Sequence, residues 1–185
     1  GFDPDSVFLT GGSAGAHLAL LMALTPNRPE FQPGFEEVNT RVQGWTGFYG
    51  AYDFYSCFEK SDPENARSIL LQVVTGGTPD THPEIYRQSS PFHWSSKNLP
   101  PGMMLQGEQD TLIPMEEALS MQNHLKQEAA ENQILLRVPL AQHGFDIFPL
   151  ITAQCVVPFV ERYLVLQYQK LQQKKNNEHR NPDSI

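Results

Sequence analysis

The stretch TGGSAGAHLAL, from Thr10 to Leu20, decides the fold because it joins two different structural patterns. The apolar residues before it predict a strand over Ser6–Thr10, and the residues after it predict a helix over Ala14–Leu24. The sequence GGSAG around Ser13 lies where the strand turns into the helix, and it fits the pattern G-x-S-x-G. Such a turn gives the serine a strained backbone and holds its hydroxyl up at the top of a sheet.

The neighbours of Ser13 fit the demands of this turn. Because the strand and the helix approach each other closely, the residues two before and two after the serine should be nearly free of side chains, as Gly11 and Gly15 are. Gly12 and Ala14 complete the elbow. The helix points its positive end and its free N–H groups at the serine, so the amide of Ala14 is expected to bind an oxyanion. The competing interpretation is a glycine-rich turn with an idle serine.

A serine nucleophile needs a base, and the base needs an orienting acid. His143 follows the predicted strand Ile134–Pro139, in the loop where a base would be delivered. Asp110 lies in the loop GEQDTLIP, directly after the predicted strand Gly102–Gln106. The chain order of Ser13, Asp110 and His143 is the order expected of an α/β-hydrolase triad.

Other residues compete for these roles. Glu108 and Asp146 are the rival acids, but Glu108 is expected to face water and Asp146 lies on the base's own loop. His17 follows Ser13 by one helical turn and is expected to point along the helix or away from the serine. The remaining histidines lie in other segments: His82, His93, His124 and His179.

The rest of the chain alternates strand and helix patterns. A further strand is predicted over Val42–Tyr49. Further helices are predicted over Pro63–Val74, Pro114–Ala130 and Ile151–Gln169. This rhythm predicts an α/β fold, a parallel sheet with helices on both faces.

The segment Ala51–Leu99 is long for one connection, and an insertion at the carboxyl edge of an α/β sheet commonly covers a ligand site. We therefore expect a lid-like insertion over residues 51–99. An aromatic run follows the second strand and is a candidate hydrophobic acyl-binding wall, with core packing as the alternative. The run comprises Phe48, Tyr49, Tyr52, Phe54 and Tyr55.

Charge and cysteine content limit the classes of molecule that the chain is expected to bind. The net charge of −8 argues against nucleic-acid binding, because phosphate contacts need clustered Lys and Arg. Cys57 and Cys155 are too few for a disulfide framework and match no metal-ligand spacing. Residues 170–185 are polar and are expected to form a disordered tail. We find no run long enough to span a bilayer and no signal peptide, but the chain begins with Gly1, so membrane association, compartment and oligomeric state stay open.

Three segments together resemble the nucleophile, acid and histidine regions of α/β-hydrolases: DPDSVFLTGGSAGAHLALLMAL, GEQDTLIPMEEA and PLAQHGFDIF. They are most similar to the hormone-sensitive-lipase-like carboxylesterases and lipases. The stretch TPNRPEFQPGFEEVNTRVQGWTGFYGAYDF further resembles the branch that includes actinobacterial Lip-type esterases. The resemblance implies hydrolysis of a small-molecule carboxylic ester without metal or cofactor. It implies Ser13 as nucleophile, His143 as general base and acid, and Asp110 as the orienting group.

The sequence departs from this family in two places. Gly12 stands where many members have an acidic residue before the serine. No His-Gly-Gly-Gly-type stretch precedes the serine to supply oxyanion-hole N–H groups, and the first strands of the sheet are also missing. Residues 1–169 are therefore expected to form the carboxyl-terminal part of a longer catalytic domain, impaired if made alone. Two alternatives remain: an amidase or arylformamidase on the same fold, and a non-catalytic receptor or binding module.

Overall fold

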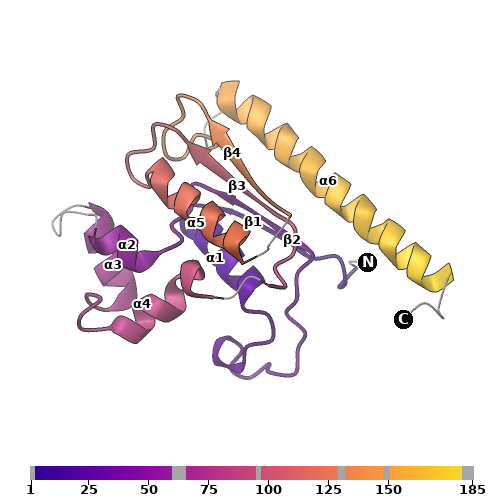
Figure 1. The fold of residues 1–185 in the computed structure, drawn as a ribbon, viewed down its shortest axis with the longest axis horizontal. Coiled ribbons are helices and arrows are strands. Elements are labelled where there is room, and N and C mark those ends of the chain that lie inside the picture. Colours follow the sequence, from indigo (N-terminus) through magenta and orange to yellow (C-terminus); the bar gives the residue numbers. More distant parts are fainter. Residues whose placement is uncertain (1–2, 60–65, 95–96, 129–131, 148–150, 181–185) are drawn as a thin grey trace.

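The computed structural model describes residues 3–59, 66–94, 97–128, 132–147 and 151–180. Its centre is a four-stranded parallel sheet with the strand order β1-β2-β3-β4 (Figure 1). The strands are β1 (Phe8–Gly12), β2 (Gly44–Phe48), β3 (Gly102–Gly107) and β4 (Gln133–Val138). Because all four strands run in the same direction, the loops that follow them meet at one edge of the sheet.

Helices cover both faces of the sheet, as the sequence predicts (Figure 1). Helices α1 (Ala14–Leu24) and α5 (Met115–Gln127) lie on one face, and α6 (Ile151–Arg180) lies on the other. The strand residues alternate between the two cores, since successive side chains of a strand point to opposite faces. Met104 packs with α1 and α5, whereas its neighbour Leu105 packs with α6.

The connection between β2 and β3 forms a group of short helices beside the sheet (Figure 1). These are α2 (Phe54–Glu59), α3 (Ala66–Thr75) and α4 (Pro83–Ser89), with a 3-10 turn at Pro91–His93. They share a small apolar cluster of their own: Phe54, Cys57, Leu71 and Tyr86. A further 3-10 turn, Pro29–Phe31, lies between α1 and β2.

The predicted elements occur in the predicted order and type, and their bounds differ by a few residues except at the end of the last helix. Helices α2 and α4 were not predicted. The helix predicted over Ala14–Leu24 has these bounds in the structure. The helix predicted over Pro63–Val74 is α3, and residues 60–65 lie outside the described residues. The helix predicted over Pro114–Ala130 is α5, and residues 129–131 also lie outside them.

The expectation of a disordered tail is wrong over residues 170–180. Helix α6 continues through them to Arg180. The physical reason is that this run consists largely of Lys, Gln, Glu and Arg, which are good helix formers, and has no Gly or Pro before Pro182. The extension also contacts the N-terminal segment, where the ammonium of Lys175 lies 3.4 Å from the carboxylate of Asp3. Residues 181–185 lie outside the described residues.

Candidate active site

Ser13 lies on the turn between β1 and α1, in a backbone conformation that residues other than glycine rarely adopt. Its φ is 54° and its ψ is −117°. Its N–H donates a hydrogen bond of 2.8 Å to the carbonyl of Phe48, at the end of the neighbouring strand β2. The sheet therefore holds the serine in the strained conformation that the sequence predicts for this elbow.

The glycines of the elbow differ in whether the structure has room for a side chain at their positions. A Cβ on Gly11 would lie 2.5 Å from the carbonyl carbon of Gly15, so Gly11 is required by the close approach of strand and helix. A Cβ on Gly12 would lie 2.8 Å from the hydroxyl of Tyr49. A Cβ on Gly15 would meet nothing within 4 Å, so the expectation that Gly15 must also lack a side chain is wrong. The crowding comes from the backbone of Gly15, which any residue carries.

The loops after β1, β3 and β4 bring three polar side chains into one chain of hydrogen bonds. The Nε2 of His143 lies 3.0 Å from the Oγ of Ser13. The Nδ1 of His143 lies 2.8 Å from the Oδ2 of Asp110. The Asp110 side chain is fully buried, whereas 22% of the His143 side chain is exposed. A serine, a histidine and a buried carboxylate in this order can pass the serine's proton to the imidazole and stabilise the charged ring.

The carboxylate of Asp110 is held from both of its oxygens. Its Oδ1 accepts hydrogen bonds from the backbone N–H groups of Leu112, at 2.9 Å, and Ile113, at 2.8 Å. Its Oδ2 accepts a bond of 3.1 Å from the side-chain amide of Gln106, besides that from His143. These hydrogen bonds offset the free-energy cost of burying a charged carboxylate, and they fix its orientation toward His143.

The rival acids take other partners. Glu108 forms an ion pair of 2.7 Å with Arg137 at the surface, as expected of a carboxylate that faces water. Asp146 accepts a hydrogen bond from the hydroxyl of Tyr49. Asp110 is thus the acid that the structure brings to His143.

The N-terminus of α1 adds donors beside the serine. The N–H groups of Ala16 and His17 donate to the carbonyl of Ser13, at 3.0 and 3.1 Å. The N–H of Ala14 precedes them, and the first N–H groups of a helix have no acceptor inside the helix. Ala14 therefore has the position expected of an oxyanion donor.

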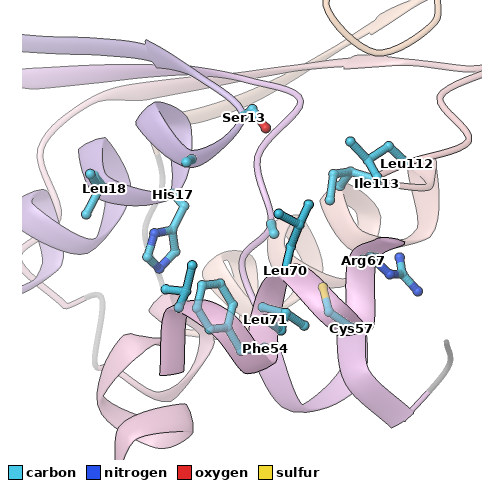
Figure 2. Close-up of a pocket in the computed structure, with 13 residues that line it drawn as sticks. Ser13, His17, Leu18, Phe54, Cys57, Arg67, Leu70, Leu71, Leu112 and Ile113 are labelled. Atoms are coloured by element: carbon cyan, nitrogen blue, oxygen red, sulfur yellow. The ribbon is translucent and has the colours of Figure 1, made fainter. Parts of the chain in front are cut away.

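A pocket of about 310 Å³ opens beside Ser13 (Figure 2). One side is formed by the elbow, and most of the other by helices α2 and α3. The side chains that line it are mainly apolar, which suits an uncharged hydrocarbon group. The lining residues are Ser13, Ala14, His17, Leu18, Ala51, Phe54, Cys57, Arg67, Leu70, Leu71, Val74, Leu112 and Ile113.

Three of the residues predicted to bind substrate lie elsewhere. Phe48 and Tyr49 are buried in the core between the sheet and α6, and Tyr52 is buried in the core between the sheet, α1 and α5. None of them lines the pocket, so the predicted aromatic wall is wrong for these residues. The strand and the bend after it turn them inward. Phe54, one turn into the insertion, is the member of the aromatic run that reaches the pocket.

His17 has a place that sequence reasoning missed. It lines the pocket and points from α1 toward the helices of the insertion (Figure 2). Its Nε2 lies 2.5 Å from the carbonyl of Ser89, and its ring stacks on Phe54 with the centroids 4.6 Å apart. Burial lowers the pKa of His17, an effect that the bond to Ser89 partly opposes. The sequence offered one signal for this position, since His17 follows Ser13 by four residues, on helix α1. It gave no signal for the partner, Ser89, which lies 72 positions away.

The described part of the chain shows no cluster of three or more His, Cys, Asp or Glu side chains that could bind a metal ion. Cys57 is buried and Cys155 is exposed, and neither forms a disulfide within the described residues. Burial, followed by the charge of Glu117, raises the pKa of the Cys57 thiol. In the same described ranges, no helix is long and apolar enough to cross a membrane.

The sequence profile of the BD-FAE family matches residues 1–125, which include the elbow and the Asp110 loop. The chain belongs to the BD-FAE family. This places it among the α/β-hydrolases, as the three sequence segments predict. The histidine loop lies outside the matched residues.

Curated relatives of this BD-FAE chain are named as esterases. The probable carboxylic ester hydrolase LipM of Mycobacterium tuberculosis (strain ATCC 25618 / H37Rv) is 38% identical over 168 residues, which cover 91% of this chain and 39% of LipM. Esterase LipC of the same organism is 37% identical, over 80% of this chain and 36% of LipC. The predicted resemblance to actinobacterial Lip-type esterases is therefore confirmed. The chain spans about two fifths of the length of LipM.

Solved structures show the same fold. A thermophilic esterase from Thermogutta terrifontis, Est2, has a TM-score of 0.68 at 23% identity, over 88% of this chain and 55% of that one. A truncated carbohydrate esterase from gut microbiota has a TM-score of 0.70 at 18% identity, over 91% of this chain and 61% of that one. At these identities the likeness establishes the α/β-hydrolase fold of this BD-FAE chain and nothing finer.

Proposed function

We propose that the protein is a serine hydrolase that cleaves carboxylic esters, with Ser13 as nucleophile, His143 as general base and acid, and Asp110 as the group that orients His143. The observation that carries this proposal is the continuous hydrogen-bond chain from the Ser13 hydroxyl through the imidazole to the buried carboxylate. The names of the relatives LipM and LipC, a carboxylic ester hydrolase and an esterase, favour the ester class.

The reaction follows from this arrangement. His143 takes the proton of Ser13 as the serine oxygen attacks the ester carbonyl, and Asp110 stabilises the imidazolium that forms. The amide of Ala14 donates to the negatively charged oxygen of the tetrahedral intermediate. His143 then gives its proton to the leaving alcohol. Water enters, loses a proton to His143 and releases the acid from Ser13 by the same steps.

The pocket supports a substrate with an apolar group next to the scissile carbonyl. Ser13 and Ala14 lie at its wall, so an acyl group bound at Ser13 can extend between α1 and α3. Phe54, Leu71 and Ile113 are buried or nearly buried in this wall and offer hydrocarbon surface. We infer that the insertion forms the acyl pocket and that the aromatic contact comes from Phe54.

The test is covalent labelling of the full-length protein that carries this chain with a fluorophosphonate probe, followed by mass spectrometry. We expect an adduct on Ser13 that is lost in Ser13→Ala and greatly slowed in His143→Ala. Paired ester and amide substrates with the same acyl group then measure the preference for esters. An adduct with faster amide cleavage would favour the amidase alternative. A folded protein without any adduct would contradict the proposal and favour a binding module.

A further inference from the structure

Tyr49 has an unusual backbone for a bulky residue. It follows β2 directly and has a φ of 43°, in the left-handed region. Its N–H donates a bond of 2.7 Å to the carbonyl of Leu105 on β3, so the neighbouring strand holds this conformation in place. Such strain persists only where the surrounding structure fixes it, and it is concentrated at functional sites. The strained backbone turns the Tyr49 ring toward the loop of His143.

The side chain of Tyr49 contacts this loop at three residues. Its ring centroid lies 4.5 Å from that of His143 and 5.2 Å from that of Phe145, the latter in an edge-to-face arrangement. Its hydroxyl donates a hydrogen bond to the carboxylate of Asp146. Burial, and then the bond to Asp146, raise the pKa of Tyr49, so the hydroxyl keeps the proton that it donates.

The same hydroxyl lies against the elbow. A Cβ on Gly12 would lie 2.8 Å from the Tyr49 oxygen, so the hydroxyl occupies the space that a side chain before Ser13 would need. Tyr49 therefore touches both the residue that precedes the nucleophile and the loop that carries the base. Its three contacts on the loop span His143 to Asp146, which limits both the tilt of the imidazole and the distance of the loop from the elbow.

We propose that Tyr49 is a positioning residue whose hydrogen bond to Asp146 fixes the loop that delivers His143 to Ser13. This inference rests on the proposed function, because it assigns a task to the same triad. Asp146 then serves as the anchor of the histidine loop and Asp110 as the acid of the triad. A misplacement of about 1 Å at a catalytic group can cost roughly 100-fold in rate, so the bond has a measurable effect.

The experiment compares Tyr49→Phe, Asp146→Ala and Asp146→Asn in the full-length protein. Active sites are first counted by titration with a nitrophenyl phosphonate, and kcat and KM are then measured per active site. We expect Tyr49→Phe and Asp146→Ala each to lower kcat roughly 10- to 100-fold with little change in KM. Asp146→Asn keeps an acceptor for the phenol and is expected to restore most of the rate. The double variant Tyr49→Phe/Asp146→Ala is expected to be no slower than either single variant, since the two groups act as one unit.

The matched control is Tyr163→Phe. Tyr163 lies in the same core cluster as Tyr49, and within the described residues its buried hydroxyl has no hydrogen-bond partner. Its removal should leave kcat and KM unchanged.

The outcomes separate this inference from the proposed function. A wild-type protein that is not labelled at Ser13 overturns both. A labelled wild type with an equally fast Tyr49→Phe variant overturns the positioning role alone. A fall in the number of titratable sites with unchanged kcat per site would also overturn it, because the pair would then support folding only. Tyr49→Phe keeps the ring that packs on His143, so the comparison does not depend on variants that fail to fold.

Discussion

The pocket beside Ser13 has two sides that are built in different ways. On the side of the sheet, backbone groups fix the chemistry: the Phe48 carbonyl binds the N–H of Ser13, and two backbone N–H groups bind Asp110. On the side of the insertion, helices α2 and α3 line the pocket with largely apolar residues such as Phe54 and Leu70. Substitutions on the sheet side should therefore change the rate or the fold, whereas those on the insertion side should change which ester fits.

The largest effect is expected on the sheet side, from Asp110→Asn. The amide cannot hold His143 in the tautomer that accepts the serine's proton, so kcat should fall by about 10⁴-fold while the fold is kept. The measurement is ester hydrolysis together with circular dichroism. Glu108→Gln is the control, since Glu108 pairs with Arg137 at the surface, and it should leave kcat nearly unchanged. Equal losses in the two variants would contradict the assignment of the acid.

The next largest effect concerns the stability of the elbow. Gly11→Ala would press a Cβ against the backbone of Gly15, at 2.5 Å, where no side chain can move aside. We expect it to lower the free energy of unfolding by about 3 kcal/mol, as overpacking does. Gly15→Ala is the matched variant, because a Cβ there meets nothing within 4 Å. It should raise the free energy of unfolding by roughly 0.5 kcal/mol through helix propensity. Urea denaturation measures both, and equal destabilisation would refute the stated difference between the two glycines.

A smaller effect is expected on the insertion side, from Leu70→Trp. Leu70 lines the pocket but is 55% exposed, so a larger side chain can be accommodated without unfolding α3. An indole that excludes two methylenes of an acyl chain should lower kcat/KM for octanoyl esters roughly tenfold, at about 0.8 kcal/mol per methylene. Acetyl esters should react as before. Ile69→Trp, on the same helix and 50% exposed, does not line this pocket and should leave the chain-length profile unchanged.

The smallest effect is expected from His17, which lies where the sheet side and the insertion side of the pocket meet. Because burial lowers the pKa of His17, the unfolded chain binds a proton more readily than the folded one. The stability that neutral His17 gives the folded protein is fully present above the pKa of the unfolded histidine, about 6.5. It is lost as the pH falls toward the lower pKa of His17 in the folded protein. The slope is at most about 1.4 kcal/mol per pH unit.

The variant His17→Gln tests this junction. Glutamine keeps an N–H donor for the Ser89 carbonyl but does not titrate. Urea denaturation at about pH 7.5 and about pH 5.5 should show a smaller loss of stability in the variant than in the wild type. Identical losses would mean that His17 does not sense pH at the junction of α1 and the insertion.

By itself the sequence predicted the elbow and the chain order of the proposed triad. The pattern around Ser13 is local: a strand, a tight turn and a helix need particular small residues at fixed spacing, so a short window suffices. Asp110 and His143 were predicted because each lies in the loop that follows a strand, and parallel strands bring these loops to one edge of the sheet. The four strands and the helices on both faces followed from the same alternation.

Only the tertiary structure decided which side chains face the pocket. Phe48, Tyr49 and Tyr52 carry the same aromatic signal as Phe54, but the direction of each ring depends on the bend after β2 and on the neighbouring elements. The partner of His17 comes from a segment 72 positions away, which no local pattern can reveal. Local propensity specifies elements and turns, whereas burial and contacts between distant segments are set by how those elements pack.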